Sequence, residues 1–257
     1  MRISSGISQQ PPAPPPLPPR VLDYVEQTPH GLWMRALSAG ATFAAGAALV
    51  EIVWDVLVLA ARVRGYPEFA VVRAWQPMLL LSQAALQWVA AWILTTDDPS
   101  PRDRPPRLFA GALRLSVTVL FLLLSADALR LYEGMTWQSR SSLRTAAQLA
   151  DLVATLLFWP YLLRMALRLS SPDLAVRAGV GLVASVVSWG CVSGPRLLAR
   201  WAGISLLDDR YSLNLAYGTD ALCSTLVVLM LLRFTFRFRD EASVKAMTND
   251  ETRITNE

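Results

Sequence analysis

Six long runs of apolar residues, separated by short segments rich in Pro, Gly and Asp, dominate the chain between Leu37 and Phe238. A transmembrane helix needs roughly 20 mostly apolar residues, so each run is long enough to cross a bilayer. We therefore predict an all-α fold, a polytopic membrane helical bundle of six transmembrane helices. The predicted spans cover residues 36–61, 75–94, 108–129, 147–169, 174–198 and 215–238.

The segments on either side of these runs do not have the composition of folded domains. Residues 1–20 contain seven of the 17 prolines, which is typical of an extended, disordered tail. Residues 21–35 resemble a short amphipathic segment lying at the membrane interface, and residues 240–257 are polar. The predicted organisation is a Pro-rich N-terminal tail with an interfacial segment (1–35), a transmembrane domain (36–239) and a disordered C-terminal tail (240–257).

Composition and charge agree with a membrane location. Hydrophobic residues make up 53% of the chain and charged residues 17%, and the net charge is +4. The arginines lie at the ends of the apolar runs rather than in one patch, so we expect the lipid bilayer, and no nucleic acid, as a partner. Of the 24 Lys and Arg, 15 lie on the side of the termini and nine on the other. This bias predicts a cell (inner) membrane protein with both termini cytoplasmic.

A weak internal repeat runs through the spans. The first, third and fifth spans begin about 70 residues apart, as do the second, fourth and sixth. The best match is between the fourth and sixth spans. In both, an aspartate is followed by two arginines at the same spacing: Asp151 by Arg164 and Arg168, and Asp220 by Arg233 and Arg237. Gln83 occupies the comparable place in the second span. The pattern fits three helical hairpins around a common axis, although chance placement of helix-end arginines would also produce much of it.

Glu51 and Asp55 lie inside the first span, one helical turn apart and therefore on one face. Counted back from Arg62, Glu51 is about 16 Å deep, near the middle of a hydrocarbon layer about 30 Å thick. A carboxylate at that depth costs a few kcal/mol or more, so it is a functional candidate. The pair can bind a cation or exchange a proton. Alternatively, it forms salt bridges with a neighbouring helix, and Arg114 and Arg196 are the possible partners.

Three further acids, Asp127, Asp151 and Asp220, lie toward the outer ends of their predicted helices. Each has a local explanation. Asp127 can pair with Arg130, Asp151 can mark one edge of the hydrocarbon layer, and Asp220 can lie in the favourable first turn of a helix. Together with Glu51 and Asp55, they would form an outward-facing acidic vestibule for cations or amines.

Other chemistry finds little support in the sequence. His30, the only histidine, precedes the first span, which excludes haem and zinc sites built on intramembrane histidines, and we predict no metal or cofactor. No phosphate-binding glycine motif occurs. Cys191 and Cys223 can form a disulfide, but buried free thiols are the commoner case. Gly190-x-x-x-Gly194 permits close helix packing, either inside the bundle or between protomers.

Three functions remain, and an enzyme is the least favoured. The first is binding or transport of a small cation or proton-coupled solute through an intramembrane carboxylate site. The second is a non-catalytic membrane-complex subunit or scaffold, which would have a homo-oligomeric or membrane-complex partner. The third is an intramembrane aspartyl hydrolase that uses Asp151 and Asp220 from facing helices.

Overall fold

The computed structural model describes residues 29–64, 66–96, 107–129, 136–203 and 210–254, and within these ranges every regular element is an α-helix. The six helices are α2 (Pro29–Arg64), α3 (Tyr66–Leu94), α4 (Arg107–Ala128), α5 (Trp137–Arg168), α6 (Pro172–Ala202) and α7 (Arg210–Ile254). All six contain a stretch long and apolar enough to cross a membrane. The prediction of an all-α, six-helix bundle is therefore confirmed.

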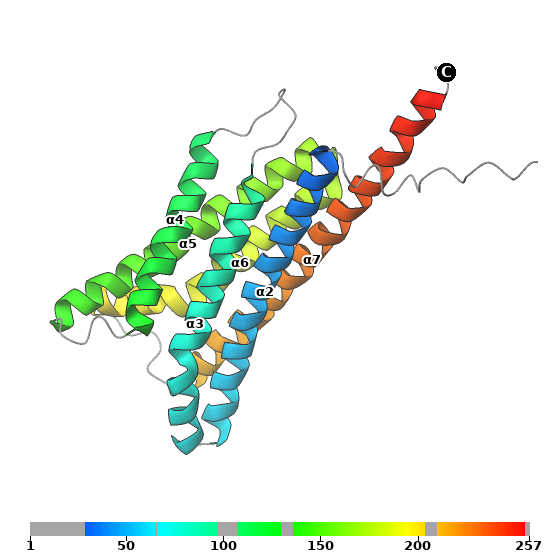
Figure 1. Cartoon of the computed structure of the whole chain (residues 1–257). Helices are drawn as coiled ribbons and strands as arrows, with labels where there is room; N and C mark the ends of the chain where they lie inside the picture. Colours follow the sequence, from blue (N-terminus) through cyan, green and yellow to red (C-terminus); the bar gives the residue numbers. More distant parts are fainter. Residues whose placement is uncertain (1–28, 65, 97–106, 130–135, 204–209, 255–257) are drawn as a thin grey trace, which may run out of the picture.

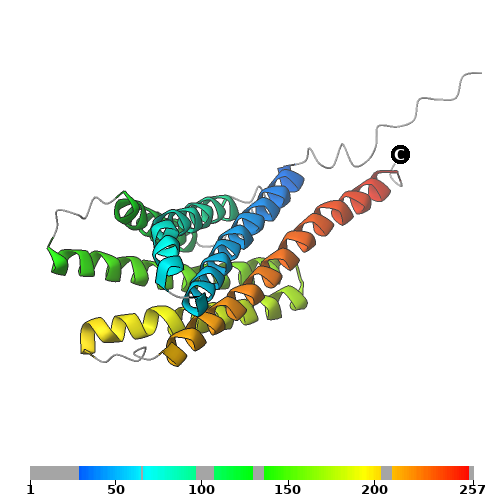
Figure 2. The ribbon, with the colours of Figure 1, turned by 90° about the horizontal axis from the view of Figure 1, so that it is seen from below.

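The helices form a closed ring in sequence order. Each packs mainly against the helices that precede and follow it, and α7 closes the ring by packing along α2 (Figures 1 and 2). A hydrogen bond from Ser38 to the carbonyl of Thr235 (3.3 Å) joins α2 and α7 near one end. The start of α2 and the end of α7 lie at the same end of the bundle, called here the termini end. The opposite end, where α2 ends and α7 begins, is called the distal end.

Several helices extend beyond the predicted spans. Helix α5 begins ten residues before the predicted span, because Thr136 caps its N-terminus by accepting a hydrogen bond from the backbone of Ser139. Helix α7 continues to Ile254, through a segment without Pro or Gly that was predicted to be a disordered tail. Residues 29–35, predicted to lie at the interface, form the first turns of α2, where Trp33 and Met34 are buried. The predictions for residues 1–28 fall outside the described residues.

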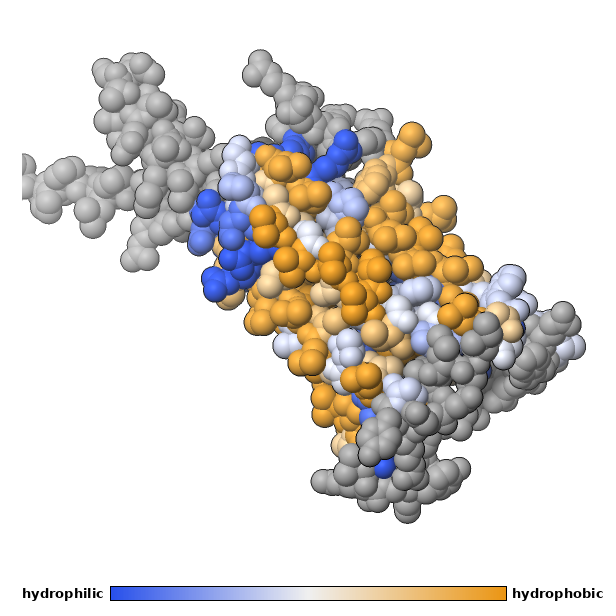
Figure 3. All heavy atoms as spheres, turned by 180° about the vertical axis from the view of Figure 1, so that it is seen from behind, coloured by the Kyte–Doolittle hydropathy of each residue, from blue (hydrophilic) through white to orange (hydrophobic). Residues whose placement is uncertain are grey.

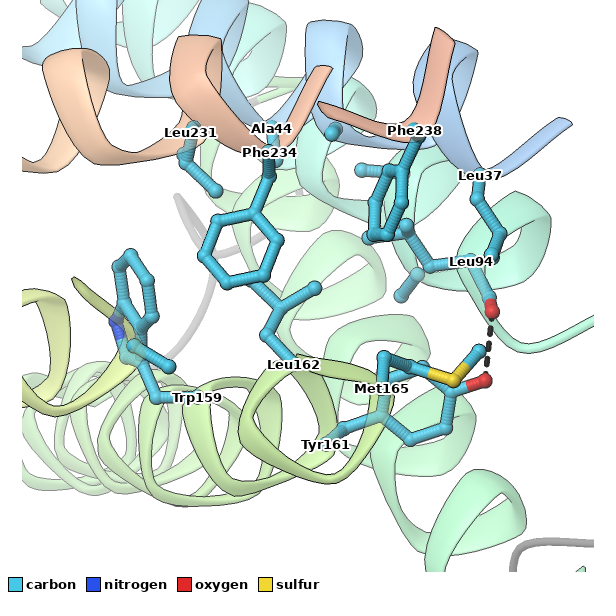
Figure 4. Close-up of a cluster of buried hydrophobic side chains, with 14 of the residues drawn as sticks. Leu37, Ala44, Leu94, Trp159, Tyr161, Leu162, Met165, Leu231, Phe234 and Phe238 are labelled. Carbon is cyan, nitrogen blue, oxygen red and sulfur yellow. Dashed lines mark hydrogen bonds between the residues drawn. The ribbon is translucent and has the colours of Figure 1, made fainter. Parts of the chain in front are cut away.

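The core fills the half of the bundle nearest the termini end. It draws buried residues from all six helices, and its largest members include Trp159, Tyr161, Leu162, Phe234 and Phe238. Figure 4 shows Phe234 and Phe238 of α7 pointing toward the α5 side chains Leu162 and Met165. The hydroxyl of Tyr161 donates a hydrogen bond to the carbonyl of Leu94 (2.7 Å), which satisfies a backbone oxygen at the end of α3.

The outside of the bundle is largely apolar. Large hydrophobic side chains such as Leu115, Val183 and Leu222 are exposed on different helices. In Figure 3 an apolar band crosses one face of the molecule, and hydrophilic side chains gather toward one end. An apolar belt around a helical bundle is what a lipid environment selects, so these features support a multi-pass membrane protein.

One close helix contact depends on a glycine. The ring of Trp159 on α5 lies against Gly181 on α6, and its Nε1 donates a hydrogen bond to Ser185 Oγ (2.8 Å). A β-carbon at residue 181 would clash with three atoms of the Trp159 six-membered ring. Because Trp159 is almost fully buried, the ring has little freedom to move aside.

We expect Gly181→Ala to lower the thermal unfolding temperature in detergent micelles, because the clash costs about 1–3 kcal/mol. The matched control is Gly179→Ala on the same helix, where an added β-carbon meets open space. Alanine gains about 1 kcal/mol over glycine in a helix interior, so this control should leave the melting temperature unchanged or raise it. Equal melting temperatures for the two variants would contradict the close contact.

Candidate functional site

Polar side chains converge inside the ring in the half nearer the distal end. Glu51 and Asp55 of α2 point the same way, toward α7 and the centre of the bundle. Asp220 of α7 lies within electrostatic reach of both. Glu51 is half-buried, whereas Asp55 is only 1% exposed and Asp220 only 5% exposed. The α2–α7 seam therefore encloses three carboxyl groups.

Asp220 is held by a neighbouring helix. It accepts a hydrogen bond from the hydroxyl of Ser188 on α6, and both side chains are buried. The expectation that Asp220 lies in the first turn of its helix is wrong, because α7 begins at Arg210, ten residues earlier. Asp220 is a buried member of the cluster.

Asp151 adds the fourth carboxyl group from α5. It interacts with both Glu51 and Asp220, and it lies well inside α5 because that helix begins at Trp137. Its expected position at the edge of the hydrocarbon layer stays a prediction. The proximity of Asp151 to Asp220 is the arrangement that the aspartyl-hydrolase hypothesis requires, but a cation site would use the same proximity.

Gln83 of α3 and Ser224 of α7 complete the surroundings of Glu51, and both lie within hydrogen-bonding reach of its carboxyl group. Gln83, Asp151 and Asp220 are the three comparable positions of the weak sequence repeat. All three come from alternate helices of the ring, and all three face Glu51. We name the group of Glu51, Asp55, Asp151 and Asp220 the acidic cluster.

Asp55 differs from the other members in its hydrogen bonding. Both of its carboxylate oxygens are buried, and neither has a hydrogen-bond partner among the described residues. Asp220 lies beside it, and the two carboxyl groups can share a hydrogen bond only when one of them carries a proton. Burying a polar group without a hydrogen bond costs roughly 1–3 kcal/mol by mutational measures, so Asp55 opposes the stability of the bundle.

Asp127 does not belong to this cluster. It lies on α4 and forms a salt bridge with Arg144 of α5 (3.2 Å), in which both side chains are partly exposed. Its predicted partner, Arg130, lies outside the described residues. Asp127 thus links two helices at the surface, where an ion pair contributes at most about 1 kcal/mol.

Arginine and tyrosine side chains lie between the acidic cluster and the distal end. Arg196 of α6 donates a hydrogen bond to the hydroxyl of Tyr217 (2.6 Å) and acts electrostatically on Asp55 and Asp220. The guanidinium of Arg62 lies 5.7 Å from the centre of the Tyr217 ring. Arg196, one of the two arginines proposed as partners of the acids, therefore lies near the cluster.

Arg114, the other predicted partner, lies elsewhere. It caps the end of α3 by donating a hydrogen bond to Thr95 Oγ1 (2.6 Å), and it lies over the ring of Trp92. Arg114 is therefore not a partner of Glu51 or Asp55, because Thr95 and the carbonyl groups at the end of α3 provide a nearer partner for its charge.

The remaining candidates have no direct place in the cluster. Cys191 and Cys223 are both free thiols. An added β-carbon at Gly190 or Gly194 would meet nothing within 4 Å, so neither glycine serves close packing inside the described bundle. Within the ranges that the structure describes, no group of three or more His, Cys, Asp or Glu side chains is arranged to hold a metal ion.

Sequence reasoning did not identify Ser188, Ser224 or Tyr217. Serines inside apolar spans commonly bond to the backbone of their own helix, so nothing in the sequence distinguishes these two. Tyr217 lies three residues before Asp220, and hence one turn away on the same side of α7. That spacing is the one signal that could have found it.

We expect Asp55→Leu to stabilise the protein by about 1–3 kcal/mol, because it removes an unsatisfied buried carboxyl group and replaces it with an apolar side chain of similar size. Thermal unfolding in detergent measures the change. Asp127→Leu is the control and should shift the stability by less than about 1 kcal/mol, since its ion pair is partly exposed. A loss of stability in Asp55→Leu would mean that this carboxyl group is satisfied within the bundle.

Comparison with known proteins adds no family to this description. The chain matches no known protein family, and it has no significant match among curated proteins or among solved structures. The chemistry of the acidic cluster is therefore the basis on which a function can be assigned.

Proposed function

We propose that the protein binds a small cation or a proton-coupled solute at the acidic cluster and moves it across the membrane. The observation that carries this proposal is Asp55, which is 1% exposed and has both carboxylate oxygens unsatisfied among the described residues. Ionisable groups inside membrane domains are costly, so those that persist commonly serve binding or transfer.

The neighbours of Asp55 give the cluster its chemistry. Four carboxyl groups from three helices can exchange protons for a cation, since a cation and a proton compete for the same oxygens. Hydroxyl and amide groups of Ser188, Ser224 and Gln83 lie around the carboxyl groups as further hydrogen-bonding partners. Binding should consequently weaken as the pH falls.

The other half of the bundle supplies a barrier. Large buried side chains, among them Trp159, Phe234 and Phe238, pack together (Figure 4). They lie on helix segments nearer the termini end than the acidic cluster does. A solute that enters from the distal end would reach the carboxyl groups first and would need this apolar packing to open before it could leave on the far side. We further propose an inner-membrane location with both termini cytoplasmic, as the arginine distribution indicates.

We expect Glu51→Gln to abolish cation-coupled proton movement in reconstituted vesicles, while the protein still inserts and purifies as a monodisperse species. Glutamine preserves the size of the side chain but cannot exchange a proton. The readout is a pH-sensitive dye inside the vesicles, and the control is Asp173→Asn, which alters an exposed ion pair with Arg177 at the termini end. Full activity of Glu51→Gln would refute the proposal.

A structural role in a membrane complex is the second candidate. Gly190 and Gly194 favour it, because an added β-carbon at either one would meet no atom of the described residues within 4 Å. Small residues at this spacing allow another helix to approach closely.

If this second role is correct, replacing both Gly190 and Gly194 with Leu should dissociate a stoichiometric complex or homo-oligomer. Size-exclusion chromatography with light scattering would measure the loss of mass. Gly111→Leu, at an equally open position on α4, provides the control. An unchanged mass in the double variant would leave these glycines facing lipid alone.

A further inference from the structure

Positive charge gathers on the distal side of the acidic cluster. Arg62, Arg196 and Arg200 lie on this side, near the ends of α2 and α6. Arg200 is close enough to Arg196 and Arg144 to feel their charge. Asp220 lies one helical turn beyond Tyr217, the residue against which Arg62 and Arg196 pack. Groups of opposite charge therefore follow one another along the bundle axis.

Two of these arginines, Arg196 and Arg200, hydrogen-bond to neutral groups rather than to carboxylates. Arg196 and Arg200 have no carboxylate within salt-bridge distance in the part of the chain that the structure describes. Their hydrogen bonds go to neutral oxygens: Arg196 to Tyr217, and Arg200 to Gln148 Oε1 (3.2 Å) and Thr145 Oγ1 (3.4 Å). A guanidinium has five N–H donors, so several donors of Arg196 and Arg200 remain for an anionic group.

This arrangement discriminates against simple ions. A bare cation or a plain amine that enters from the distal end meets arginines that repel it before it reaches the carboxyl groups. A simple anion would be attracted by the arginines but repelled by the acidic cluster beneath them. A molecule that carries both charges can place its cationic end at the acidic cluster and its anionic end at the arginines.

We propose that the solute is a small zwitterion with an ammonium group at one end and a carboxylate at the other. Its ammonium group would lie among Glu51, Asp55, Asp151 and Asp220, and its carboxylate would bind Arg196 and Arg200. Tyr217 is a positioning residue, because its hydroxyl accepts the hydrogen bond that orients the Arg196 guanidinium. The inference rests on the proposed function, because it assigns the solute class of the same site.

The test measures binding of matched probes to the purified full-length protein in lipid nanodiscs by isothermal titration calorimetry. Three zwitterions of increasing length (glycine, 4-aminobutyrate and 6-aminohexanoate) are each compared with the amine and the carboxylic acid of the same length. We expect at least one zwitterion to bind about tenfold more tightly than both of its single-charge counterparts, because only the zwitterion interacts with both the acidic cluster and the arginines.

Variants test the contributions of the arginines and of the acidic cluster separately. Arg196→Gln should weaken the preferred zwitterion about tenfold and leave the matched amine unchanged or tighter, and Arg196→Lys should be intermediate because it keeps the charge but not the planar fork. Glu51→Gln should weaken the zwitterion and the amine alike. Arg177→Gln, at the termini end and paired with Asp173, is the control and should change neither.

The outcomes distinguish this inference from the function on which it rests. If the amines bind as tightly as the zwitterions and Glu51→Gln weakens them, the zwitterion inference is wrong and the cation site stands. If none of the probes binds the wild-type protein, the inference is also wrong, whereas proton movement that is lost in Glu51→Gln would still support the cation site. If Glu51→Gln alters neither binding nor proton movement, both proposals fail. The comparison of wild-type affinities decides the inference even where a variant does not fold.

Discussion

A carboxyl group in the hydrocarbon layer must face protein or water rather than lipid, and this constraint governs the bundle. Glu51 and Asp55 share one face of α2, so that face has to point inward, which also determines the opposite, lipid-facing side of the helix. Helix α7 covers the seam and brings Asp220 beside them. The contact between the first and last helices closes the ring, and the ring gives the acidic side chains an interior to occupy.

The two halves of that interior differ in character. Toward the termini end, aromatic and branched side chains from all six helices fill the space, and their few polar atoms bond locally, as Tyr161 does to the carbonyl of Leu94. Toward the distal end, acids, serines and arginines replace them. Apolar packing favours a closed, stable barrier, whereas unsatisfied polar groups reduce stability where binding chemistry is needed. Stability and candidate function are thus separated along the axis.

Hydropathy alone predicted the six helices, because length and apolar content are local properties of the chain. The shared face of Glu51 and Asp55 followed from helical geometry. The inward position of Asp151 and the burial of Asp220 did not, since both depend on how the helices pack against one another. Helices α5 and α7 also start earlier than their apolar runs. Arg196, and not Arg114, lies near the acids. This depends on how the helices pack together, which the spacing of residues along the sequence does not reveal.

The contact between Trp159 and Gly181 restricts how the bundle can move. The indole ring lies against the backbone of α6 and is also tied to Ser185, so a sliding motion of α5 past α6 would drive the ring into neighbouring side chains. A small rotation about this point would separate the two helices at one end while they remain in contact at the other. The tryptophan would then act as a fulcrum, which makes rocking, rather than translation, the accessible motion of this helix pair.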